Sequence, residues 1–122
     1  MTRIQCITVD SADPLKLANF WAAVLSWEIT YKTDNEVCIE LLDGSAAQGV
    51  IPDLLFIKVP DAKAGKNRLH VDLRPDDQAA EVARIEGLGG VRIEIGQSAD
   101  PDTTWVVMAD PEGNEFCVLK AL

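Results

Sequence analysis

His70 is the only histidine in this 122-residue chain and the side chain best suited to proton transfer near neutral pH. It lies two positions before Asp72 in a segment that alternates apolar and polar residues, so both are expected on one face of a β-strand. An imidazole there can act as a general base or donate a hydrogen bond to a substrate oxygen. A purely structural hydrogen-bonding role is the alternative, and the sequence leaves both open.

Glu40 is the second candidate for acid–base chemistry, because it lies in the middle of a predicted strand among apolar neighbours. A desolvated carboxylate in that position is suited to proton transfer. The alternative is a carboxylate at the mouth of a cleft, solvated or paired with Lys or Arg. His70 and Glu40 are therefore the candidate catalytic residues.

The three cysteines, Cys6, Cys38 and Cys117, are odd in number and widely spaced, which argues against a disulfide framework. Their positions inside apolar runs are typical of reduced, buried thiols in a cytosolic protein. The N-terminus has no apolar core long enough for a signal peptide, and no apolar run approaches the roughly 20 residues that span a bilayer. We therefore expect a cytoplasmic protein.

Length and charge narrow the function classes further. A chain of 122 residues fits one domain, here residues 1–122. The net charge of −9 argues against nucleic acid or an anionic membrane as partner, because both require a basic surface. A small-molecule ligand is the partner we expect.

The elements that must position these residues occur twice, in the order βαβββ. Helix starts are predicted at Asp13-Pro14 and at Asp76 or Asp77, and Gly89-Gly90 is predicted to end the second helix. The expected first series is a strand at 3–10, a helix at 13–26 and strands at 27–32, 36–42 and 54–59. The expected second series is a strand at 68–74, a helix from Asp76 or Asp77 to residue 88, and strands at 91–95, 104–109 and 116–119.

The order predicts an α+β fold of two βαβββ modules, module 1 about 1–60 and module 2 about 67–122, with a polar linker between them. One helix covers only one face of a four-stranded sheet. We expect the two open faces to form a curved mixed sheet around a concave pocket, with the helices on the outer face. Strand alternation directs Thr8 and Asp72 to this pocket, and Trp27 and Trp105 are strand aromatics that can line it.

Several motifs together resemble the vicinal-oxygen-chelate superfamily, which holds glyoxalase I, bleomycin-resistance proteins and extradiol dioxygenases. They are the doubled βαβββ order, the Asp13-Pro14 helix start with Phe20-Trp21, the 68–73 strand, and the Asp-Pro-Glu-Gly-Asn turn at 110–114. The chain is most similar to the small glyoxalase-like domain proteins, and the resemblance covers essentially its whole length.

The resemblance implies a metal site built from four strand positions, which in this chain are Cys6, Ile57, His70 and Cys117. Ile57 cannot ligate a metal and would only line the pocket. Cys6 and Cys117 could ligate as thiolates beside His70, a set that suits Zn²⁺ or a similar divalent metal with one open position. A metal-free pocket is the alternative, since the usual His, Glu or Gln ligands are absent at three of the four positions.

Two functions follow from the resemblance. The first is an enzyme, a lyase or isomerase or a relative of the dioxygenases, that uses His70 and Glu40. The second is a non-catalytic protein of the resistance type, which sequesters a small hydrophobic or aromatic compound. The resemblance also implies a homodimer, with the modules paired within one chain or exchanged between two.

Overall fold

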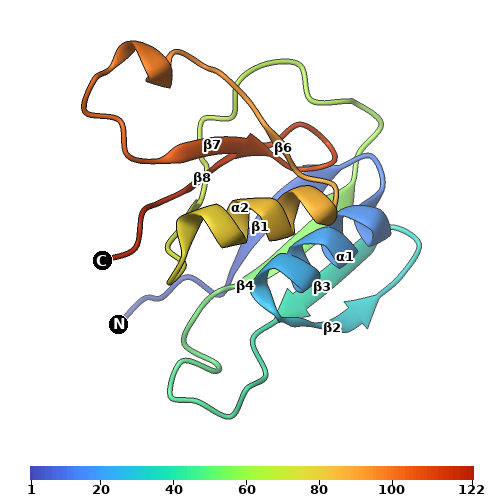
Figure 1. Cartoon of the computed structure of the whole chain (residues 1–122). Helices are drawn as coiled ribbons and strands as arrows, with labels where there is room; N and C mark the ends of the chain where they lie inside the picture. The colour runs from blue at the N-terminus through green and yellow to red at the C-terminus, as the bar shows by residue number, and fades with distance from the viewer. The chain divides into compact units, whose positions relative to one another are not determined.

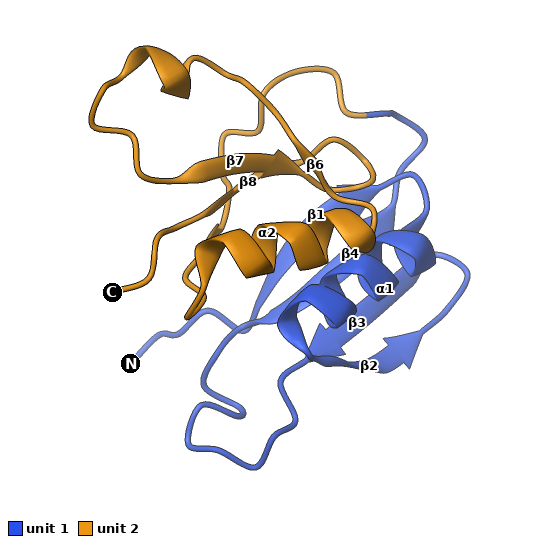
Figure 2. Ribbon diagram, viewed as in Figure 1, with its two compact units in different colours: residues 1–62 blue, residues 63–122 orange.

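The computed structural model describes all residues, 1–122, and they form two compact units. Unit 1 comprises residues 1–62 and unit 2 comprises residues 63–122 (Figures 1 and 2). Each unit holds one α-helix and one four-stranded mixed sheet. The predicted α+β fold with two βαβββ modules is confirmed, as two separate sheets.

Unit 1 has the sheet order β1-β4-β3-β2, in which β1 runs parallel to β4 and the other neighbours are antiparallel. Its helix follows the first strand, as a parallel β1–β4 pair requires a crossover. The elements are β1 (Cys6–Ser11), α1 (Pro14–Leu25), β2 (Glu28–Lys32), β3 (Glu36–Glu40) and β4 (Asp53–Lys58).

Helix α1 begins and ends where its sequence predicts. The Asp13 carboxylate accepts a hydrogen bond from the backbone N–H of Lys16 at 3.2 Å, and Pro14 occupies the first helical position, where its missing N–H is harmless. Ser26 ends the helix in the left-handed conformation at φ +58°. Helix α1 packs against β3 and β4, whose Val37, Ile39 and Phe56 are fully buried. The buried face of the helix is an apolar stripe made of Leu17, Phe20, Trp21 and Val24.

Unit 2 has the corresponding order β5-β8-β7-β6, again with the first and fourth strands parallel. Asp77 is the N-cap of its helix and accepts a hydrogen bond from Ala80 N at 3.0 Å. Gly89, at φ +109°, follows the helix end. The elements are β5 (Asp72–Leu73), α2 (Gln78–Gly87), β6 (Val91–Arg92), the 3₁₀ helix η1 (Gln97–Ala99), β7 (Val106–Ala109) and β8 (Glu115–Val118).

The outer strands of unit 2 are much shorter than the alternation predicts. The strand predicted at 68–74 pairs with β8 only at Asp72–Leu73, opposite Cys117 and Val118. Leu69, within the predicted strand, is 71% exposed. The strand predicted at 91–95 pairs only at Val91–Arg92. In unit 1 the first strand begins at Cys6 rather than at residue 3.

The strand register shows the internal repeat more clearly than the sequence does. Val59 N donates to Ser11 O at 2.9 Å in unit 1, and Leu119 N donates to Leu73 O at 2.7 Å in unit 2. One residue before Ser11 and Leu73, Asp10 pairs with Ile57 in unit 1, as Asp72 pairs with Cys117 in unit 2. Aspartate therefore occupies the same position in both modules.

The turn at 110–114 is closed by the buried carboxylate of Asp110, which is 4% exposed. It accepts hydrogen bonds from Glu112 N and Asn114 N and from the Asn114 side-chain amide, at 2.9–3.0 Å. Gly113 has φ +86°, a conformation that favours glycine. The turn thus fixes the start of β8.

The segment predicted to be a polar linker is bound to this turn. Glu115 accepts hydrogen bonds from Lys63 Nζ and Asn67 N, both at 3.0 Å, and the Asn67 amide donates to Asn114 Oδ1 at 3.1 Å. Residues 63–67 therefore belong structurally to unit 2.

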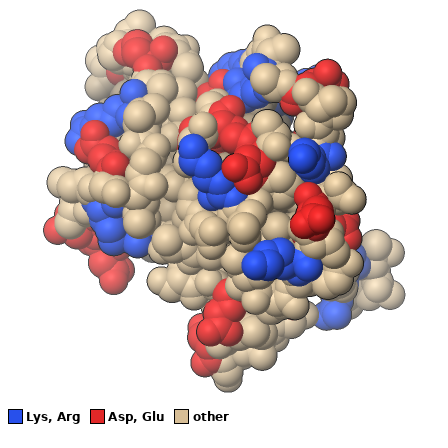
Figure 3. All heavy atoms as spheres, turned by 90° about the vertical axis from the view of Figure 1, so that its right-hand side faces the viewer, with Lys and Arg blue, Asp and Glu red and all other residues tan.

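Charged side chains of both signs lie interspersed on the face shown in Figure 3, where no extended area of Lys and Arg gathers. Neither helix has the length and apolar content needed to cross a membrane. The absence of nucleic-acid and membrane partners stays a prediction.

Candidate functional site

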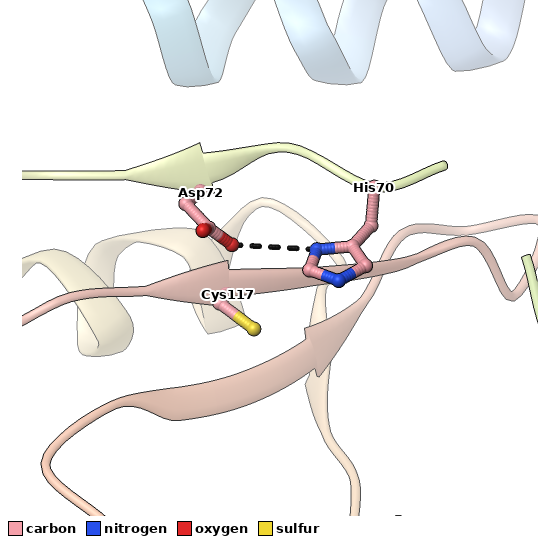
Figure 4. A group of neighbouring side chains, drawn as sticks. All are labelled: His70, Asp72 and Cys117. Carbon is pink, nitrogen blue, oxygen red and sulfur yellow. Dashed lines mark ion pairs between the residues drawn. The ribbon is translucent and has the colours of Figure 1, made fainter. Parts of the chain in front are cut away.

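The side chains of His70, Asp72 and Cys117 converge in unit 2, and we call them the unit 2 group (Figure 4). Each offers a nitrogen, oxygen or sulfur atom, and these atoms all lie within 4.8 Å of one another. His70 Nδ1 lies 3.3 Å from Asp72 Oδ1. An imidazole, a carboxylate and a thiol thus share one small region.

Two neighbouring strands bring the group together. Asp72 on β5 is the register partner of Cys117 on β8, so their side chains project from the same face. His70 lies two residues before Asp72, and Figure 4 shows its ring directed toward the carboxylate. The side chains of His70 and Asp72 are 39% and 49% exposed, whereas Cys117 is 9% exposed. The imidazole is therefore open to a small molecule and the thiol is not.

Burial raises the pKa of the Cys117 thiol above its ordinary value. The negative charge of Asp72, and a hydrogen bond between this carboxylate and the thiol, raise that pKa further. Cys117 is accordingly protonated at neutral pH, and its S–H donates to Asp72. One carboxylate thus contacts both the imidazole and the thiol.

Glu40 lies in a second group, in unit 1, with Cys38 and Asp53; we call it the unit 1 group. Their sulfur and carboxylate oxygen atoms all lie within 4.8 Å of one another, and all three residues are half-buried. Asp53 was not predicted as a site residue. Its alternation with Leu55 and Ile57 is the only sequence signal that it shares their face.

The remaining predicted pocket residues of unit 1 are Thr8, Ile57 and Trp27. Thr8 is exposed on β1, with Oγ1 3.9 Å from Cys6 Sγ. Ile57 is half-buried opposite Asp10, and Trp27 is half-buried directly after α1. The metal set Cys6, His70 and Cys117, and a joint role for Glu40 and His70, each draw on both units and stay predictions.

Trp105 lines a groove within unit 2 with a volume of about 490 Å³. The groove follows the loop between β6 and β7, and polar side chains share its lining with the indole: Arg92, Gln97, Ser98 and Thr103. Its size falls within the range of small-molecule sites. An aromatic side chain with several hydrogen-bonding groups around it suits a planar ligand.

The unit 2 group fits a divalent metal by its chemistry. Imidazole nitrogen, thiolate sulfur and carboxylate oxygen are all zinc ligands, and three protein ligands leave a fourth position open. The 3.3 Å between His70 Nδ1 and Asp72 Oδ1 also matches a carboxylate that orients the ring of a ligating histidine through its other nitrogen. These residues therefore suit a metal in two ways. All three can be ligands, or His70 and Cys117 can be the ligands while Asp72 orients the imidazole.

The comparisons with known proteins agree with this fold. The family model described as glyoxalase-like domain matches residues 6–119. None of the curated proteins matches the sequence of this chain at a significant level.

Among solved structures, a glyoxalase/bleomycin resistance protein/dioxygenase family enzyme from Burkholderia phytofirmans has a TM-score of 0.72 at 14% identity, covering 99% of this chain and 100% of that one. A fosfomycin resistance protein from Listeria monocytogenes, complexed with Mn(II) and dihydroxypropylphosphonic acid, has a TM-score of 0.72 at 15% identity, covering 100% and 92%. The trypanothione-dependent glyoxalase I of Leishmania major has a TM-score of 0.66 at 14% identity, covering 98% and 87%. At these identities the likeness concerns the fold.

The family match extends over nearly the whole chain, from the first residue of β1 to the residue after β8. The doubled βαβββ order and the structural neighbours point the same way. The chain belongs to the glyoxalase-like domain family, within the vicinal-oxygen-chelate superfamily.

Proposed function

We propose that the chain is a small-molecule enzyme of the glyoxalase and bleomycin-resistance type, a lyase or isomerase in which His70 transfers a proton. The observation that carries this proposal is the 3.3 Å pair between His70 Nδ1 and Asp72 Oδ1. A carboxylate beside Nδ1 favours the tautomer that carries its proton there, which leaves the lone pair of Nε2 free to take a proton. The partial exposure of the ring allows a substrate to reach it.

A divalent metal gives the same site a second form, in which His70 and Cys117 hold the ion and Asp72 ligates it or orients the imidazole. When bound, the metal supplies Lewis-acid polarisation of a substrate oxygen. In that form His70 would hold the metal instead of acting as the base.

The substrate classes to try first come from the structural neighbours. One neighbour is a fosfomycin resistance protein and another is a trypanothione-dependent glyoxalase I. We propose fosfomycin and thiol-linked glyoxalase substrates as the first panel. The dioxygenase relationship in the description of a further neighbour adds aromatic diols.

The test is turnover of this panel by purified wild-type chain, with and without added divalent metal, alongside elemental analysis. His70→Gln keeps a polar side chain of similar size, and Asp76→Asn serves as control because Asp76 is exposed and outside the unit 2 group. Loss of turnover in the first variant alone supports the proposal. Turnover that survives His70→Gln rejects it.

A second function is supported by the Trp105 groove: sequestration of a small hydrophobic or aromatic compound without catalysis. Binding of such a compound would quench the indole fluorescence. In this case Trp105→Ala weakens binding while His70→Gln leaves it unchanged. If the chain is an enzyme, His70→Gln should reduce turnover more than Trp105→Ala does.

We also propose, from the family resemblance, that the chain forms a homodimer in the cytoplasm. Its three cysteines are free, as suits a reducing compartment. Light scattering coupled to gel filtration tests the dimer directly. A mass of one chain at micromolar concentration would contradict it.

A further inference from the structure

The unit 1 group lies on the sheet face opposite helix α1. Val37 and Ile39 are fully buried against the helix side, so Cys38 and Glu40, which alternate with them on β3, project from the other face. Asp53 projects from that face too, since Cys38 pairs with Leu55, two residues further along β4. Three donor side chains from adjacent strands thus meet on one open surface.

A fourth donor lies beside them. Cys6 on β1 is the register partner of Asp53, so it continues the row across a third strand, and it interacts electrostatically with Cys38. The Gln5 amide donates to Asp53 Oδ2 at 3.5 Å, a contact that steadies this carboxylate from outside the group. β3, β4 and β1 therefore contribute two thiols and two carboxylates to one area.

No ion pair neutralises the negative charge of this area. Glu40 and Asp53 place two carboxylates within 4.8 Å of one another and of the Cys38 sulfur. None of the four ion pairs of the structure includes them; those pairs all lie in unit 2. A bound cation would relieve the repulsion between these like charges on a half-buried surface.

We propose that Cys38, Glu40 and Asp53 bind a Zn²⁺ ion, with Cys6 or water completing its coordination. The thiol selects against Mg²⁺ and Ca²⁺, which prefer oxygen ligands alone, and a mixed sulfur and carboxylate set is one that zinc accepts. The site lies wholly within unit 1. It is distinct from the unit 2 group and extends beyond the proposed function, whose chemistry depends on His70.

The test uses the full chain and Zn²⁺ alone. Calorimetry measures Zn²⁺ binding, and Co²⁺ as a substitute ion reports thiolate ligation through its thiolate-to-metal absorption. The unit 2 group is first removed with the double variant His70→Gln, Cys117→Ser, so that only the unit 1 group remains. In that background we expect one Zn²⁺ per chain. Addition of Cys38→Ser or of Asp53→Asn should weaken Zn²⁺ binding by more than about tenfold, and Cys38→Ser with Cys6→Ser should abolish the Co²⁺–thiolate band.

Glu36→Gln is the matched control, because Glu36 lies on β3 with the same alternation and is not part of the group. Circular dichroism establishes that each variant is folded, and Glu40→Gln replaces Cys38→Ser if the latter is not. Absence of Zn²⁺ binding in the double variant would overturn the proposal, as would equal affinity in the Asp53→Asn and Glu36→Gln variants. The proposed function fails separately, through turnover that survives His70→Gln in the otherwise wild-type chain.

Discussion

Asp72 Oδ1 lies 3.3 Å from Nδ1 of His70, and the same carboxylate accepts a hydrogen bond from the Cys117 thiol. One side chain thus lies against the only imidazole and adds to the effect of burial on the pKa of Cys117. These two effects make Asp72 a positioning residue whose removal has separate, measurable consequences for each neighbour.

The first consequence concerns the imidazole tautomer. In Asp72→Ala the Nδ1–H loses its acceptor, so the neutral ring should shift toward the Nε2–H form. Both side chains are partly exposed, which limits the effect to about 0.5–1 kcal/mol, or a two- to fivefold change in the tautomer ratio. Nitrogen-15 NMR measures it without ambiguity, because the chain has one histidine. An unchanged ratio, relative to Asp76→Ala, would show that Asp72 does not orient the ring.

The second consequence concerns Cys117, whose pKa is raised by burial and then by Asp72. In a Cys6→Ser, Cys38→Ser background, Asp72→Asn should speed alkylation of Cys117 severalfold at pH 8, because less of the thiol remains protonated. Stability follows the same logic: the unfolded chain ionises this thiol at its ordinary pKa and the folded chain does so only at higher pH. The free energy of unfolding should therefore fall as pH rises above the ordinary cysteine range. Alkylation at the rate of the Asp76→Asn control would contradict this account.

A third prediction concerns Glu115 at the start of β8. Burial opposes the ionisation of Glu115 and by itself would raise its pKa. The hydrogen bonds from Asn67 N and Lys63 Nζ together have the larger effect, so the pKa is lowered. This stabilisation is present above the ordinary pKa of glutamate and is lost as pH falls through the lower, folded-state pKa. Glu115→Gln should therefore reduce the free energy of unfolding by about 1–2 kcal/mol at neutral pH, and by less in acid. Urea unfolding at several pH values measures this. A difference from wild type that is independent of pH, or one matched by the exposed-site control Asp61→Asn, would rule the explanation out.

The turn that precedes β8 gives a fourth prediction. Gly113 has φ +86°, and a Cβ there would lie 3.8 Å from the nearest atom, Lys63 Cδ, so backbone conformation rather than space is limiting. Gly113→Ala should lower stability by about 1–2 kcal/mol. Gly65 lacks a positive φ and has open space, so Gly65→Ala should be neutral or slightly stabilising. Equal thermal unfolding midpoints for the two variants would refute this.

Local signals predicted the helices and turns well, because the physical causes lie within a few residues of one another. The Asp13-Pro14 start and the Asp77 cap both hold their helices through short-range hydrogen bonds. The Asp-Pro-Glu-Gly-Asn turn is likewise closed by its own Asp110. The doubled order of elements, and hence the fold, follows from these signals.

Strand lengths and the contents of the two groups depend on partners that are distant in sequence. Alternation at 68–74 could not reveal that β8 pairs with only two of those residues. Nor could it show that Asp53, after a loop of irregular sequence, lies within 4.8 Å of Cys38 and Glu40. His70 lies 3.3 Å from Asp72, as their spacing of two residues predicts, although β5 begins only at Asp72.

The most direct test of the central claim is the specificity constant kcat/KM of His70→Gln on any compound of the fosfomycin, glyoxalase-substrate and aromatic-diol panel that the wild-type chain converts. The claim that His70 transfers a proton predicts a loss of about 10²- to 10⁴-fold in this variant, with Asp76→Asn unchanged. Full activity in His70→Gln, or binding of these compounds by the wild-type chain without any conversion, would contradict it.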